Sequence, residues 1–67
     1  MEEEVKKSVL ISIRLLEQEI QELRAQSNYT QNESTRIMCS NQMLSYILAI
    51  QHLRECINQE ENQDENI

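Results

Sequence analysis

The chain has 67 residues and a formal net charge of −6, and it contains no Gly, Pro, Trp or Phe. Glycine and proline are the commonest turn residues, so their absence argues against a sheet protein and favours helices. A chain this short forms at most one small domain, which is marginally stable alone and usually depends on a partner, a metal or disulfides. Its six Lys and Arg residues are scattered along the sequence, which makes nucleic acids and anionic membranes poor candidate ligands.

Residues 2–26 have the periodicity of one amphipathic helix. Three glutamates follow Met1 and favour a helix N-terminus through the helix dipole. Apolar residues spaced by three and four positions form the stripe expected in a hairpin core: Val9, Ile13, Leu16, Ile20 and Leu23. Leu10, Ile11 and Leu15 fall outside this stripe and hint at a second contact surface.

Residues 27–30 are expected to form a tight turn. Asn28 is the best residue available for a left-handed helix C-terminus in a chain without glycine. Thr30 and Glu33 have the spacing of a capping box, which predicts a second helix over about residues 31–58. The alternative is one unbroken helix, which would place several consecutive polar residues in a coiled-coil seam.

The second helix is apolar on two sides. One stripe completes the hairpin core with Met43, Ile47, Ile50, Leu53 and Ile57, and Cys39 and Tyr46 lie along it. A second stripe, formed by Ile37, Leu44 and Leu48 with Tyr46 near its rim, lies well round the helix. A helix that is apolar on two sides needs two neighbours, so the sequence predicts that these four residues bind a partner.

The predicted fold is all-α: a two-helix antiparallel hairpin of the helix-turn-helix coiled-coil type over residues 1–58. Residues 59–67 are polar and acidic, and they are expected to form a disordered tail. The acidic start of the chain does not resemble a signal peptide, and the apolar run Tyr46–Ile50 is too short to span a bilayer. A cytoplasmic protein is therefore expected.

The residues that carry chemistry are sparse. Cys39 and Cys56 would lie about 26 Å apart on one helix, too far for a disulfide, and are expected to be reduced thiols. His52 and Cys56 share a helix face, but a structural zinc site needs four ligands. The chain has one histidine and no glycine for a phosphate loop. The sequence therefore predicts a binding protein that is not an enzyme and holds no metal or cofactor.

Two segments resemble the small co-chaperones of type III secretion needle subunits, the YscE/PscE type. Met43–His52 is similar to the Leu- and Ile-rich part of their second helix, which ends near a histidine, and Leu15–Leu23 is similar to their first helix. The likeness covers about residues 9–57, although this turn lacks glycine and the acidic tail is longer. The resemblance implies a partner: a larger helical-repeat chaperone, with which the chain would keep a needle subunit soluble and monomeric in the cytoplasm.

Two other functions fit parts of the sequence. The same apolar stripes could build a homo-oligomeric coiled coil or a four-helix assembly of two hairpins. The element Ile20–Arg24 resembles one found in small two-helix phosphatases of response regulators. The nearest matches to the signature of their second helix, residues 40–44 and 45–49, lack its functional aspartate.

Overall fold

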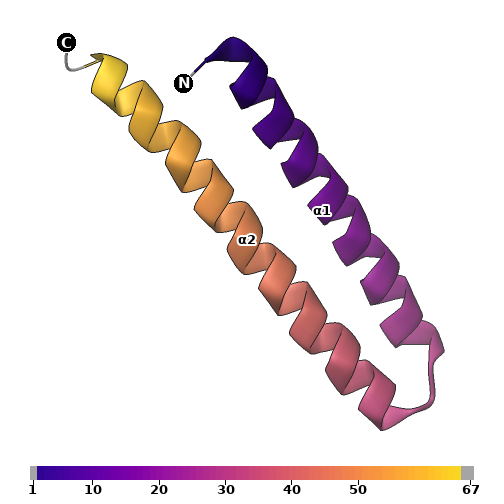
Figure 1. The fold of residues 1–67 in the computed structure, drawn as a ribbon. Helices are drawn as coiled ribbons and strands as arrows, with labels where there is room; N and C mark the ends of the chain where they lie inside the picture. Colours follow the sequence, from indigo (N-terminus) through magenta and orange to yellow (C-terminus); the bar gives the residue numbers. More distant parts are fainter. Residues whose placement is uncertain (1, 66–67) are drawn as a thin grey trace.

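The computed structural model describes residues 2–65, with side chains described for residues 2–59. The chain forms two helices, α1 (Glu3–Tyr29) and α2 (Glu33–Glu65), which run antiparallel as a hairpin (Figure 1). The expected all-α hairpin is confirmed, and a single unbroken helix is ruled out by the break at residues 30–32.

The helices are longer than the sequence patterns predict. α1 continues through residues 27–29, which were expected to lie in the turn, and α2 runs to Glu65 rather than ending near residue 58. The side chains of residues 60–67 lie outside the described ones, so the disorder expected for the tail over residues 59–67 stays a prediction.

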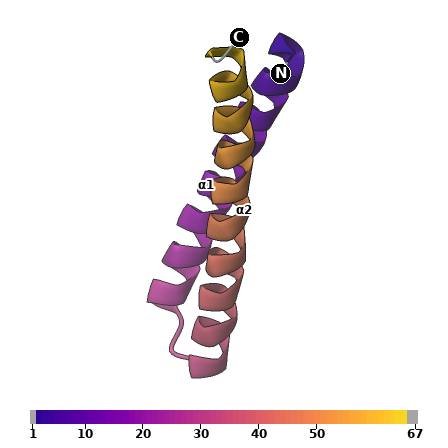
Figure 2. The same cartoon turned by 90° about the vertical axis from the view of Figure 1, so that its left-hand side faces the viewer.

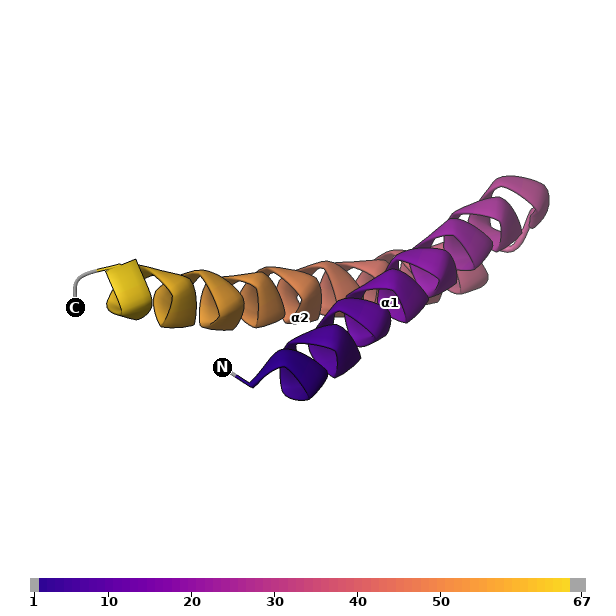
Figure 3. The same cartoon turned by 90° about the horizontal axis from the view of Figure 1, so that it is seen from above.

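The hairpin is a single layer. Its Cα atoms extend over 54 × 18 × 11 Å, and its two helices lie side by side with no third element stacked on them among the described residues. Figures 2 and 3 show that α1 and α2 are inclined to one another. Only the side chains along the line where the two helices touch, here called the seam, can be buried by the hairpin itself.

Four isoleucines form the centre of the seam. Ile13 and Ile20 of α1 and Ile50 and Ile57 of α2 are between 4% and 8% exposed. The residues packed against them are Val9, Leu16, Met43, Tyr46 and Leu53. Burying such side chains is the main term that stabilises the hairpin, at about 25 cal/mol for each Å² of apolar area removed from water.

Two residues of the predicted core lie toward its margin. Leu23 is half-buried, and Ile47 is 39% exposed. Ile47 precedes Ile50 by three positions, and three residues fall short of a full helical turn by about 60°. This offset turns Ile47 toward one edge of the seam, so the expectation that places it inside the core is corrected.

The first helix ends without the left-handed residue expected at Asn28. No described residue has a positive φ, and Thr30 is extended, with φ −80° and ψ 144°. A left-handed conformation costs a residue with a Cβ about 1–2 kcal/mol, which the extended Thr30 avoids. The backbone N–H of Thr30 still donates to the Gln26 carbonyl at 3.0 Å and closes the last turn of α1.

The second helix is capped by Asn32 rather than by the predicted Thr30–Glu33 box. Asn32 Oδ1 accepts a bond from the Thr35 N–H at 3.2 Å, and the Asn32 carbonyl accepts from the Arg36 N–H at 3.1 Å. Thr30 cannot serve this role because it ends α1, and its hydroxyl accepts instead from the Asn32 N–H at 3.2 Å. The short linker therefore provides hydrogen-bond partners for the backbone groups at the two helix ends without a glycine.

The two cysteines have opposite environments on α2. Cys39 is 3% exposed and lies outside the isoleucine cluster, in the half of the hairpin nearer the linker, whereas Cys56 is exposed. Both are free thiols, as the sequence predicts.

The isoleucine seam yields a matched pair of substitutions. Ile13→Ala removes a buried side chain and should lower the free energy of unfolding by about 2–5 kcal/mol. Ile11→Ala makes the same change in the same helix at a residue that is 60% exposed, and its effect should stay within about 0.5 kcal/mol. Urea unfolding followed by circular dichroism measures both, and equal losses would contradict this seam.

Thiol labelling tests the packing near the linker. In the native protein Cys56 should react rapidly with a disulfide reagent, while Cys39 should react slowly because the reagent must wait for the hairpin to open. In urea the two rates should converge. Fast reaction of both thiols under native conditions would show that Cys39 is not packed against α1.

Candidate protein-interaction surfaces

Three large aliphatic side chains form what is here called the α2 outer surface. Ile37, Leu44 and Leu48 are 57%, 56% and 56% exposed. Each precedes a residue on the core side by two positions: Ile37 precedes Cys39, and Leu48 precedes Ile50. Two residues turn a helix by about 200°, so the α2 outer surface lies back to back with the seam.

Tyr46 does not belong to this surface. It is half-buried and packs against the isoleucine cluster. The physical reason is the same rotation, because Tyr46 follows Leu44 by two positions and therefore points to the opposite side of α2. The expectation that Tyr46 borders the partner-binding stripe is corrected, while Ile37, Leu44 and Leu48 all lie on one exposed face.

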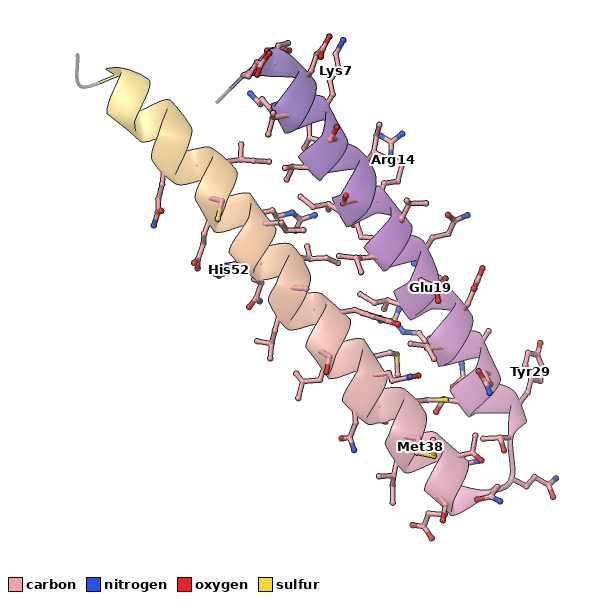
Figure 4. The ribbon with its side chains drawn as sticks, in the orientation of Figure 1. Lys7, Arg14, Glu19, Tyr29, Met38 and His52 are labelled. Carbon is pink, nitrogen blue, oxygen red and sulfur yellow. The ribbon has the colours of Figure 1, made fainter. Side chains whose placement is uncertain are left out.

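Two exposed side chains near the linker were missed by the sequence patterns. Met38 is 66% exposed and Tyr29 is 88% exposed. Tyr29 lies at the end of α1 and points away from α2 (Figure 4). Their exposure depends on where α1 ends and on which side of α2 packs against α1. Neither residue belongs to an apolar stripe of three- and four-residue spacing in the sequence.

A second apolar surface lies on the first helix. Leu10, Ile11 and Leu15, here called the α1 outer surface, are 49%, 60% and 56% exposed. Leu10 and Ile11 line a shallow depression with Lys7 and Arg14, whose side chains point away from α2 in Figure 4. Large exposed apolar side chains are therefore not confined to α2.

The two outer surfaces are separate. A guanidinium nitrogen of Arg54 lies 3.5 Å from a carboxylate oxygen of Glu17, and this exposed ion pair places residue 54 level with residue 17. In an antiparallel pair, Leu15 then lies about midway along α1, while Leu44 lies nearer the linker. One partner helix could not cover both surfaces, because Ile11 and Leu15 face away from the seam on α1 while the α2 outer surface faces away from it on α2, and the two lie at different heights.

A groove runs along one side of the seam. It has a volume of about 280 Å³ and is lined by Glu17, Ile20, Gln21, Arg24, Ile47, Ile50, Gln51 and Arg54. Small-molecule sites are commonly larger, about 300–1,000 Å³, and enclose most of the ligand. This seam groove is open and better suited to the side chains of another protein.

The described residues offer little else for catalysis or metal binding. None of the polar or charged side chains at positions 2–59 is buried, and His52 points away from α1 (Figure 4). No group of three metal-ligating side chains occurs in the part of the chain that the structure describes. Neither helix, as far as it is described, has a stretch long and apolar enough to cross a membrane.

Comparisons of the chain with protein-family models, with curated proteins and with solved structures found no match. The likeness to secretion co-chaperones therefore remains an expectation drawn from Leu15–Leu23 and Met43–His52. The features on which a function can be argued are the two outer surfaces and the seam groove.

Proposed function

We propose that the chain is a protein-binding module that docks on a helical partner through the α2 outer surface. The observation that carries the proposal is a row of three aliphatic side chains, each more than half exposed, on the side of α2 that the hairpin cannot cover. Ile37 and Leu44 are separated by one heptad, and Leu48 follows by one further turn. That spacing is the one by which a helix meets another helix.

Docking would stabilise both the complex and the hairpin. Fully burying a large aliphatic side chain contributes about 1.5–3 kcal/mol, so covering the exposed part of each is worth roughly half of that. A two-helix chain of 67 residues has a small core. Partner binding therefore adds a substantial fraction to a small folding free energy.

The resemblance supplies a specific form of this role. The chain would pair with a larger helical-repeat chaperone in the cytoplasm and help it to keep a type III secretion needle subunit soluble and monomeric. The polar and acidic residues around the apolar row support this proposal, because they would stay in solvent and keep the assembly soluble. In this role the chain binds and masks, and it catalyses no reaction.

Self-association is the second candidate, because α1 and α2 both have outer apolar surfaces. Two hairpins that pair through Ile37, Leu44 and Leu48 would form a four-helix assembly. Sedimentation of the pure protein distinguishes the two functions. A stable homo-oligomer of defined size would cover the α2 outer surface without a foreign partner, whereas a monomer leaves it free.

Two substitutions to aspartate test whether the partner binds at the α2 outer surface. Purification of the tagged protein from its native host should recover a helical-repeat protein and a small secreted helical subunit. The double substitution Leu44→Asp and Leu48→Asp places charges in the interface, so it should abolish this recovery while helicity by circular dichroism is kept.

The matched control is Gln42→Asp with Ser45→Asp, which adds the same charge to exposed positions on other faces of the same segment of α2. This variant should retain the partners. If the L44D/L48D protein still retains them, or if both double variants lose them equally, the partner does not bind at the α2 outer surface.

A further inference from the structure

We infer that the seam groove is a second docking site, and that its occupant is an amphipathic helix of another protein with acidic residues flanking its apolar stripe. The groove lies between α1 and α2, whereas the α2 outer surface lies on the far side of α2. The inference is independent of the proposed function, because it rests on different residues.

The floor of the groove is apolar. Ile20 and Ile50 are almost fully buried beneath it, and Ile47 is 39% exposed along it. A third helix laid in the groove would cover the remaining exposed part of Ile47 and convert the two-helix seam into a three-helix core. This is the usual way in which a helix docks between two others, with its apolar side chains placed into the space between their ridges.

The rim of the groove is basic, although the chain as a whole has a net charge of −6. Arg24 from α1 and Arg54 from α2 line it, against the single carboxylate of Glu17. Glu17 is already paired with Arg54, and among the described residues Arg24 has no ion-pair partner. An unpaired guanidinium beside an apolar floor favours a ligand that brings carboxylates to the edge of its own apolar stripe.

Helix geometry extends this row of arginines. Arg36 does not line the groove itself, but it lies about five full turns before Arg54 on α2, so the two side chains leave the helix on the same side. The Nε of Arg36 donates to the Thr30 carbonyl at 3.3 Å, which places this side chain at the linker end of that row. From the pairing of residue 54 with residue 17, Arg24 lies roughly 10 Å along the groove from Arg54, and Arg36 lies roughly 16 Å further. A helix of about 18 residues would reach all three arginines.

A second copy of the chain is a poor occupant. In a symmetric dimer the same patch, with two arginines against one glutamate, would face an identical patch, and two surfaces of like net charge repel one another. A copy docked through a different surface would form an open-ended chain instead of a closed assembly. The charge of the rim therefore selects a foreign acidic helix.

Two synthetic peptides of about 18 residues test the inference with the 67-residue chain. Both have leucine and isoleucine at the core positions of the heptad, and the flanking positions are glutamate in the acidic peptide and lysine in the basic peptide. Fluorescence anisotropy should show that the acidic peptide binds and the basic one does not. The affinity should fall as salt is added, because the Debye length shrinks from about 10 Å at 0.1 M to about 3 Å at 1 M.

Variants of the protein locate the site. Arg24→Glu should raise the Kd of the acidic peptide about tenfold, because it replaces attraction by repulsion at the rim. Arg14→Glu makes the same change on the α1 outer surface and should alter the Kd less than about twofold. Ile47→Gln should also weaken binding, whereas Leu48→Gln, an equally uncharged change on the side of α2 opposite Ile50, should leave peptide binding unchanged, which separates this site from the α2 outer surface.

Three results would overturn the inference. The first is that neither peptide binds, and the second is that the two peptides bind equally. The third is that Arg24→Glu and Arg14→Glu have the same effect, which would indicate a general response to net charge. Circular dichroism of each variant confirms that the hairpin is intact, because Arg14, Arg24 and Ile47 are all exposed.

Discussion

The packing of four isoleucines along one seam is the interaction on which the whole structure depends. Ile13, Ile20, Ile50 and Ile57 are the centre of the only contact between two helices, and no third element among the described residues supports either helix. A helix of this length in water is marginal by itself, because most helical stability comes from packing of the apolar face. If the seam opens, both helices lose their main stabilisation at the same time. The hairpin should therefore unfold cooperatively, and its binding surfaces should be lost with it.

The same seam determines which surfaces remain available to partner proteins. A hairpin of two helices leaves the residues off the seam at the surface, and the apolar residues there have no internal partner. Those on the outer side of α2 form a row that suits another helix. Along one edge of the seam, helix geometry gathers arginines from both helices into a basic rim, although the chain is acidic overall. The two surfaces differ in chemistry, one purely apolar and one mixed, so they suit partners of different kinds.

The sequence predicted part of the candidate sites. The exposed row of Ile37, Leu44 and Leu48 could be found from spacing alone, because residues that share a helix face share it in any tertiary context. The basic rim could not be found in this way. Arg24 and Arg54 are far apart in sequence, and they line the same groove only because the hairpin places residue 54 beside residue 17. Arginines that read as scattered along the chain therefore become neighbours in space.

By itself the sequence determined the helical class, the hairpin and the stripe that is buried, since these follow from local propensity and a 3.6-residue period. Only the tertiary structure decided where each helix stops and which edge residues are covered. Asn32 caps α2 because Thr30 is occupied in ending α1, a competition that depends on how the linker joins the two helices. Tyr46 is packed against the cluster and Ile47 is left along the groove because α1 covers only part of the apolar side of α2. Spacing tells which residues share a face, but the packing of one helix on the other decides how much of that face is buried.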